Sequence, residues 1–286
     1  MPTLSDLHPA AHAAARAATA WLRLPIRGRA WRGENGNWQG AGIGSSIDFQ
    51  DHRPYLAGDD PRYIDWQAFA RSGHYLMKLY REEVSPRVDL LLDASASMFF
   101  DPAKERRVWE LFYFAAESAF QIGASLRAYI QTKEGVVLIP SDALLSHQAM
   151  DVSAGRTESV PWRTGSLRVW ISDLLFPEPP EPYFIRLASG KGRCMVLAPF
   201  AACECQPDWS GNLRFVDCES GADRIQHVPN ELLVRYRNAW ERHFALWRDS
   251  ARRHGALMAR ISAEGHLETA VRTEAMHVGA LELRHG

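Results

Sequence analysis

The chain has little cysteine and no long apolar run. Its four cysteines are too few and too clustered for a disulfide framework in 286 residues, so we expect reduced thiols at Cys194, Cys203, Cys205 and Cys218. The spacing of Cys203-x-Cys205 is also shorter than in common zinc knuckles. No stretch approaches the roughly 18 to 20 consecutive apolar residues of a membrane-spanning helix. We therefore expect a chain without direct membrane insertion.

An excess of either charge is also lacking. The 33 basic residues nearly balance the 34 acidic ones, which argues against nucleic acid or an anionic membrane as the partner. Hydrophobic residues make up 46% of the chain, enough for one substantial core with or without a smaller subdomain. The Ala-rich start, Pro9 to Leu24, lacks the residue order of a signal peptide. We expect an amphipathic helix there, in a cytoplasmic protein.

The rest of the chain predicts an α/β fold. From Val88 onward, short apolar runs alternate with helical stretches, as in a parallel sheet covered by helices. The expected strands are Val88 to Leu92, Ser125 to Gln131, Val136 to Ile139, Leu167 to Ile171, Cys194 to Ala198 and Leu213 to Val216. The expected helices are Lys104 to Gln121, Tyr183 to Ala188 and Glu231 to Gly255, of which the last has an aromatic stripe that we interpret as core-facing.

The first of these strands ends in a motif with metal-binding chemistry. The apolar run leads into Asp93-x-Ser95-x-Ser97, so a strand delivers a carboxylate at its carboxyl end and two hydroxyls follow in the turn. Mg²⁺ prefers octahedral oxygen coordination and keeps several waters, which suits two hydroxyls with water-bridged carboxylates. One coordination position then stays open for a partner's carboxylate. The same residue types are also ordinary in turns and helix N-caps, so the pattern alone leaves both interpretations open.

A second acidic residue follows another expected strand. Val169 to Ile171 leads into Ser172-Asp173. In open α/β folds, ligands bind beyond the carboxyl ends of the strands, near a topological switch point. We therefore expect Asp93 and Asp173 to lie at one sheet edge, where they would take part in a Mg²⁺ (or Mn²⁺) site.

This set of residues resembles the von Willebrand factor A fold and its metal-ion-dependent adhesion site. That site uses Asp-x-Ser-x-Ser after the first core strand, a threonine from a later loop and an aspartate after the fourth strand. Asp93, Ser95, Ser97 and Asp173 match. The resemblance implies a threonine ligand, for which Thr157 is the candidate and Thr164 the substitute. The segment that holds both is short for the usual loop and helix, so the site is either complete with one of them or degenerate.

An upstream string resembles a more specific family. It contains Arg53-x-Tyr55, Gly58-Asp59-Asp60-x-Arg62-x-Ile64-Asp65-Trp66 and Ala70-Arg71, and it is similar to the signature of the domain of unknown function 58 family, which is linked with MoxR-type AAA ATPases. The later Asp217-x-Glu219-x-Gly221 also resembles that family. We expect residues 1–86 to form a helix and a family-specific extension packed on the core, and residues 87–286 to form a von Willebrand A-like domain with a C-terminal helix and tail. Family members often carry N-terminal membrane helices. This chain has none, so we expect it in the cytoplasm, or at a membrane only through a partner.

The charged part of the upstream string has two interpretations. It can be a structural clasp, in which its aspartates and arginines satisfy one another and fasten the extension. It can also be a docking surface for a partner, because Arg and Trp are enriched at interface hot spots. The candidate docking residues are Arg53, Asp59, Asp60, Arg62, Asp65 and Trp66.

The resemblance favours a non-enzymatic adaptor. We expect it to bind a protein carboxylate through the metal site and to work with a MoxR-type AAA ATPase in assembling or remodelling a protein complex whose client is unidentified. The first alternative is a metal-free scaffold of the same fold, in which the serines only cap a helix. The second is a Mg²⁺-dependent phosphohydrolase with Asp93 as nucleophile, although Ser95 stands where a haloacid-dehalogenase-like enzyme has a second aspartate.

Overall fold

The computed structural model describes residues 4–25, 47–56, 59–82, 86–140, 144 and 156–284. The chain divides into two compact units, unit 1 with Met1–Arg32 and Pro86–Gly286, and unit 2 with Gly33–Ser85. Helix α1 (Leu4–Thr19) packs against α3 (Pro102–Gln121) in the core of unit 1. The sequence pattern predicts this helix in one segment with the family-specific extension.

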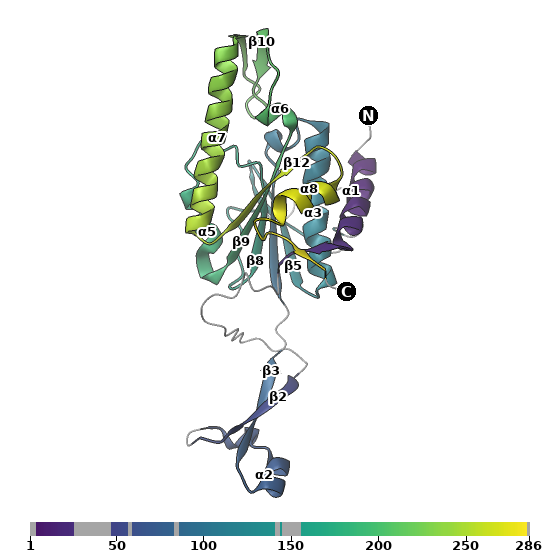
Figure 1. The fold of residues 1–286 in the computed structure, drawn as a ribbon, viewed down its shortest axis with the longest axis vertical. Helices are drawn as coiled ribbons and strands as arrows, with labels where there is room; N and C mark the ends of the chain where they lie inside the picture. Colours follow the sequence, from purple (N-terminus) through teal and green to yellow (C-terminus); the bar gives the residue numbers. More distant parts are fainter. Residues whose placement is uncertain are drawn as a thin grey trace. The chain divides into compact units, whose positions relative to one another are not determined.

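Unit 1 is built on a mixed β-sheet. Within the described residues it has seven strands in the order β12-β9-β8-β4-β5-β6-β7. Figure 1 labels β5, β8, β9 and β12 of this sheet. The strands are β4 (Arg87–Asp93), β5 (Ser125–Thr132), β6 (Gly135–Ile139), β7 (Arg156–Thr157), β8 (Leu167–Ile171), β9 (Arg193–Phe200) and β12 (Leu257–Ser262). Neighbours from β12 to β5 pair in parallel, whereas β6 and β7 add to the edge as antiparallel strands. The expected α/β class with a mostly parallel sheet is confirmed.

Strand β4 shows why these residues form a central strand. Val88, Leu90 and Leu92 belong to the apolar core on one face of the sheet, and Leu91 belongs to the core on the other face. A strand buried on both faces needs a continuous apolar run rather than an alternating one. The run before Asp93 therefore places that carboxylate at the end of a strand in the middle of the sheet.

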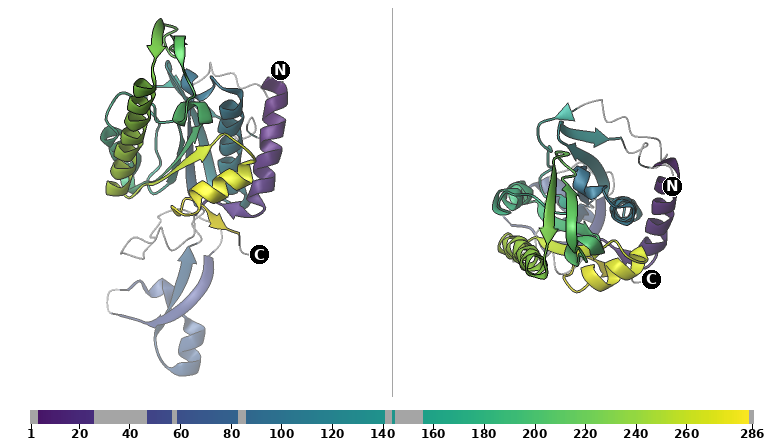
Figure 2. Two further views of the ribbon diagram at one scale, coloured as in Figure 1. Left: turned by 45° about the horizontal axis from the view of Figure 1, so that its top comes forward. Right: turned by 90° about the horizontal axis from the view of Figure 1, so that it is seen from above.

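Helices cover both faces of the sheet in unit 1 (Figure 2). Helices α1, α3 and α8 (Leu267–Ala275) contribute to the core cluster on one face, and α5 (Glu181–Ala188) and α7 (Asn230–Arg253) to the cluster on the other. On the second face, Trp247 of α7 packs against Trp170 of β8 and Phe184 of α5, with ring centroids 6.1 and 5.8 Å away. The aromatic stripe of α7 therefore faces the core at Trp240 and Trp247, as expected.

Smaller elements complete unit 1. Strand β1 (Leu22–Arg23) pairs with β13 (Glu282–Leu283), and β10 (Gly211–Val216) forms an antiparallel hairpin with β11 (Asp223–Val228). The run from Leu213 to Val216 is a strand as expected, but it lies in this hairpin and not in the central sheet. The short helices are η3 (Ala96–Met98), η4 (Ser189–Lys191) and α6 (Ala202–Cys205).

Unit 2 contains a strand pair with a helical insertion. Strands β2 (Ile47–Pro54) and β3 (Leu76–Glu82) are antiparallel, and η2 (Pro61–Tyr63) and α2 (Trp66–Ser72) lie between them in sequence. Helix α2 begins at an Asp65 N-cap and ends at Gly73. The glycine has φ of 70°, a left-handed conformation that costs glycine little.

Two further expectations concern the whole chain. None of the helices in the described part of the chain is long and apolar enough to cross a bilayer. All four cysteines lie in described segments and are free thiols, with Cys194 buried and Cys203 and Cys218 exposed.

Candidate functional site

The candidate site lies at the carboxyl ends of β4 and β8, which are neighbours in the sheet. The chain leaves β4 through α3 and enters β5 on one side of β4, while β8 lies on the other side. Asp93 is the last residue of β4, and Asp173 follows β8 by two residues. The fold therefore brings Asp93, Ser95, Ser97 and Asp173 to one edge of the sheet.

Asp93 is buried and acts as an acceptor. Its Oδ1 accepts a hydrogen bond from the backbone N–H of Ser95 at 2.9 Å, and its Oδ2 accepts one from the Ser172 hydroxyl at 2.8 Å. Burial raises the pKa of Asp93 above its usual range, because the hydrogen bonds from Ser172 and Ser95 offset only part of the desolvation, and the nearby charge of Asp173 raises it further.

The two motif serines contact each other and a distant hairpin. The hydroxyls of Ser95 and Ser97 are 3.1 Å apart, and the backbone N–H of Ser97 donates to Glu219 Oε1 at 2.8 Å. Glu219 lies in the turn between β10 and β11, and Lys133 Nζ lies 3.0 Å from its Oε2. Burial alone would raise the pKa of Glu219, but the Ser97 N–H and Lys133 lower it overall. The hairpin turn thus places a carboxylate beside the serine pair.

Asp173 is paired with a buried ammonium group. Lys104 Nζ, on the first turn of α3, lies 2.8 Å from Asp173 Oδ2 and 2.7 Å from Glu204 Oε1. The Lys104 side chain has no exposed surface. Burial raises the pKa of Glu204, and the charge of Lys104 and its hydrogen bond work against that rise. The ammonium and the two carboxylates connect α3, the end of β8 and α6.

The two candidate threonines do not reach Asp93. Thr157 is level with Asp93 along the strands, because Asp93 pairs with Gln131, Gln131 with Val136, and Val136 with Thr157. It is three strands away, however, which is roughly 14 Å at the usual strand spacing. Its hydroxyl donates to the carbonyl of Ser159 at 3.0 Å.

Thr164 lies at the other end of the sheet. It precedes β8, whose first residue, Leu167, pairs with Val88 near the start of β4. Neighbouring Arg163 is held at that end by an ion pair with Asp89, in which Nε lies 2.6 Å from Oδ1. The structure therefore brings together Asp93, Ser95, Ser97 and Asp173, and it places both threonines elsewhere.

The described residues fit poorly as a magnesium site of the kind that the motif implies. Mg²⁺ requires near-ideal octahedral coordination by oxygen. The hydroxyl from a later loop is missing from the part of the chain that the structure describes, and both oxygens of Asp93 already accept protein hydrogen bonds. Asp173 is already neutralised by Lys104. Nor do three His, Cys, Asp or Glu side chains gather in the described segments as a metal cluster would.

Four residues of this edge were not among the predicted site residues, although Ser172 and Glu219 lie in motifs that the sequence pattern singled out. They are Lys104, Ser172, Glu204 and Glu219. Lys104 had a readable signal, because it shares the apolar face of its helix with Val108 and Leu111, at positions i+4 and i+7. A charged side chain on a core-facing stripe must find a buried partner. Glu204 had no such signal.

In unit 2, the candidate docking residues pair with one another. Arg53 makes a bidentate ion pair with Asp59, at 2.6 and 2.8 Å, and Asp59 Oδ2 also accepts the backbone N–H of Leu56. The bonds from Arg53 and Leu56 lower the pKa of Asp59 to about 2. Asp60 caps η2 and pairs with Arg62 at 2.7 Å.

Asp65 and Trp66 differ in exposure. Asp65 accepts hydrogen bonds from Gln67 N and Ala68 N at the start of α2, and His52 Nε2 lies 2.8 Å from its Oδ2. Trp66 is 59% exposed and contacts Phe69 and Tyr75 edge-on. The aspartates and arginines therefore pair within unit 2, and Trp66 is left on its surface.

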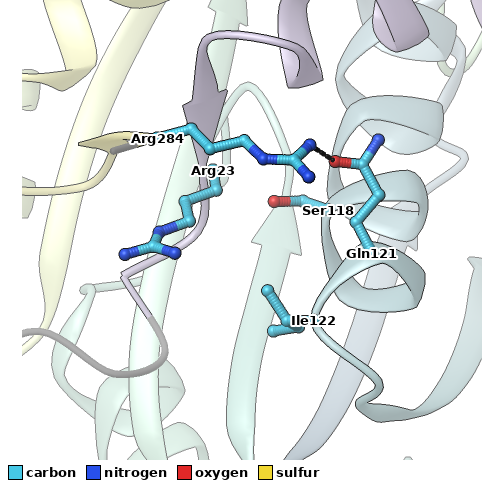
Figure 3. Close-up of a pocket in the computed structure, with 5 residues that line it drawn as sticks. All are labelled: Arg23, Ser118, Gln121, Ile122 and Arg284. Atoms are coloured by element: carbon cyan, nitrogen blue, oxygen red, sulfur yellow. Dashed lines mark hydrogen bonds between the residues drawn. The ribbon is translucent and has the colours of Figure 1, made fainter. Parts of the chain in front are cut away.

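A cavity of about 230 Å³ lies away from this edge, beside the C-terminal end of α3 (Figure 3). Arg23, Ser118, Gln121, Ile122 and Arg284 line it. Its polar groups have partners: Arg284 Nη1 donates to Gln121 Oε1 at 2.8 Å, Ser118 Oγ accepts Leu24 N at 2.8 Å, and Arg23 pairs with Glu282 at 3.5 Å. These contacts fasten β1 and β13 to α3.

Comparison with known proteins gives distant structural neighbours and a family. The conserved hypothetical protein BatB from Bacteroides thetaiotaomicron is 10% identical, with a TM-score of 0.34 over 68% of this chain and 99% of that one. An aerotolerance-related membrane protein from Bacteroides fragilis is 14% identical, with a TM-score of 0.29 over 59% of this chain and all of that one. Likeness at this level says nothing about whether these proteins share a function with this chain. No curated protein matches the chain.

The family match falls on the segment that carries the upstream string. Residues 51–154 match the family model described as protein of unknown function DUF58, and this segment includes the paired residues of unit 2 and the Asp-x-Ser-x-Ser motif of unit 1. The resemblance to the DUF58 family seen in the sequence is therefore confirmed over residues 51–154.

Proposed function

We propose that unit 1 is a non-catalytic, von Willebrand factor A-like module that binds another protein through the carboxyl edge of β4 and β8. The observation that carries this proposal is the topology. Strand β4 is a switch point, with β5 on one side and β8 on the other, and the polar residues gather where both strands end. In open α/β folds this is the place where ligands bind.

The state of the polar groups favours binding over catalysis. A nucleophilic aspartate needs an ionised oxygen that can reach its substrate. Asp93 is buried with a raised pKa, and both of its oxygens accept hydrogen bonds from within the protein. These features weigh against the phosphohydrolase alternative.

The surface around the edge supports protein contact. Phe100, in the loop after η3, is 47% exposed, and Leu175, two residues after Asp173, is 37% exposed. Large apolar side chains beside a polar cluster are typical of an interface core and its rim. Phe100 follows β4 in the chain, and Leu175 follows β8, so each lies shortly after a strand that ends at this edge.

The class of partner comes from the family resemblance. It suggests a cytoplasmic adaptor that works with a MoxR-type AAA ATPase and presents or remodels a client protein. The geometry supports this proposal only in that the carboxylates of the edge are held by hydrogen bonds and ion pairs within the protein. The client is a further protein, which the adaptor and the ATPase together would select.

The test is a binding measurement with a matched control. The full chain and the MoxR-type ATPase of the same organism are purified, and their affinity is measured by calorimetry. Leu175→Arg places a charge at the proposed edge, and Leu246→Arg makes the same change at a 61% exposed position on α7. We expect at least about a tenfold loss of affinity for Leu175→Arg alone, equivalent to about 1.4 kcal/mol. Equal binding by the two variants would refute the edge, and no binding by the wild-type chain would refute this partner.

A further inference from the structure

The ammonium group of Lys104 is a fully buried charge beside the candidate site of unit 1. Its side chain is completely buried, and its Nζ donates to Asp173 Oδ2 at 2.8 Å and to Glu204 Oε1 at 2.7 Å. The ring of Phe100 lies 5.2 Å from the same nitrogen. A buried ammonium is retained only where its charge is matched, and here two carboxylates match it.

The two carboxylates are themselves fully engaged. The second oxygen of Asp173 accepts the backbone N–H of Leu175 at 3.2 Å, and the second oxygen of Glu204 accepts that of Ala201 at 2.7 Å. Each carboxylate thus receives one backbone donor and one donor from Lys104. The arrangement is complete without any further ligand.

We propose that Lys104 supplies, at this edge, the positive charge that a divalent cation supplies in sites with an Asp-x-Ser-x-Ser motif, so that the edge is assembled without a metal ion. The inference concerns how the edge is held together. It goes beyond the proposed function and holds whether or not the edge binds a protein, so the two can fail separately.

Three observations support the replacement. Asp173, the residue that matches the second carboxylate of the motif, gives its Oδ2 to Lys104. The remaining motif groups bond within the protein, since Asp93 accepts from Ser95 and Ser172. A divalent ion at Asp173 would also lie close to a fixed ammonium in a buried environment, where repulsion between like charges is poorly screened.

The first experiment uses the wild-type protein. The chelator-stripped full chain is titrated with MgCl₂ and with MnCl₂ by calorimetry, and its melting temperature is measured with and without EDTA. We expect no saturable heat from either ion and no shift of the melting temperature. Saturable one-site binding that Asp93→Ala abolishes would overturn the proposal, and this result requires no variant of Lys104 to fold.

The second experiment removes the ammonium. Lys104→Met keeps most of the side-chain volume but leaves the carboxylates of Asp173 and Glu204 facing one point without a cation. We expect a lower melting temperature, which Mn²⁺ or Mg²⁺ partly restores because the ion takes the vacated position between the carboxylates. Lys133→Met is the matched control, since it removes a 65% exposed ammonium from the same edge, and its melting temperature should not respond to either ion.

Two outcomes of the second experiment would contradict the proposal that Lys104 takes the place of a divalent cation. A Lys104→Met protein that melts like the wild type would show that the ammonium does not hold the edge together. A destabilised variant that neither ion restores would show that the position cannot be served by a metal. Either result would contradict the replacement.

Discussion

The backbone N–H of Ser97 lies 2.8 Å from Oε1 of Glu219, a residue 122 positions further along the chain. This bond, with the ion pair between Glu219 and Lys133, holds the turn of the β10–β11 hairpin against the carboxyl edge of β4. The hairpin is a separate two-stranded sheet, so contacts of this kind, and not strand pairing, attach its turn to the edge.

Glu219→Ala should loosen the hairpin without unfolding unit 1. The substitution removes the acceptor for Ser97 and the carboxylate partner of exposed Lys133, which keeps its hydrogen bond to the backbone carbonyl of residue 219. Exposed ion pairs contribute at most about 1 kcal/mol. Hydrogen exchange should become faster for the amides of residues 211–228 and stay unchanged in β4. Asp223→Ala is the control, because its ion pair with Arg214 lies within the hairpin. Equal exchange in both variants would mean that Glu219 does not anchor the turn.

Asp89→Asn should destabilise unit 1 strongly. Asp89 has no exposed side-chain surface and lies 2.6 Å from Arg163 Nε, so the change leaves a largely buried guanidinium without its counter-charge. We expect a loss of about 3 to 5 kcal/mol in the free energy of unfolding, measured by urea denaturation.

The ion pair of Asp223 with Arg214 tests whether burial is the cause. Its N–O distance is also 2.6 Å, but both side chains are about half exposed or more. Asp223→Asn should change the free energy of unfolding by less than about 1 kcal/mol. Similar losses in Asp89→Asn and Asp223→Asn would contradict the role of burial.

Trp247→Ala should open a cavity under α7. Trp247 is 1% exposed and packs against Trp170 and Phe184. Truncating a buried tryptophan costs about 3 to 5 kcal/mol. The neighbouring Leu246 is 61% exposed, so Leu246→Ala should stay within about 0.5 kcal/mol of the wild type. Denaturant unfolding of both variants measures the difference, and a small effect of Trp247→Ala would mean that α7 packs less tightly than the contacts indicate.

In unit 2, Asp59 should stay ionised at a lower pH than an ordinary aspartate. Its pKa is about 2, because Arg53 and the Leu56 N–H favour the carboxylate. This pKa is depressed relative to the unfolded chain, so its stabilising effect is present above about pH 3.9 and is lost as the pH falls through about 2. A carboxyl ¹³C titration by NMR checks the value.

Arg53→Gln identifies the cause of that depression. Without the guanidinium, the pKa of Asp59 should move back towards about 3.9. Asp60 serves as the internal control, because its pKa is lowered mainly by Arg62 and should stay low in Arg53→Gln. A titration of Asp59 that the variant leaves unchanged would assign the shift to the backbone bond from Leu56.

Most of the central sheet could be predicted from local patterns, but the short edge strand β7 and the strand β12 could not. Strands β4, β8 and β9 are buried on both faces and are mostly apolar, with buried charges at Asp89 in β4 and Arg168 in β8. Strand β12 contains Arg260, whose guanidinium lies 4.0 Å from the ring centroid of Phe244. This contact stabilises a charge inside a sheet strand. The residues around Arg260 in the sequence give no sign that its partner lies on helix α7.

The location of the candidate site follows from residue patterns along the chain. A carboxylate that follows a buried strand must emerge at the carboxyl edge, and Asp93 and Asp173 do so on neighbouring strands because parallel strands end on the same side of a sheet. The groups that face those carboxylates are known only from the folded chain. The distance of Thr157 from Asp93, the burial of Lys104 and the approach of Glu219 depend on how distant segments pack. Residue spacing along the chain does not encode such distances, because they are determined by packing between helices, strands and the hairpin.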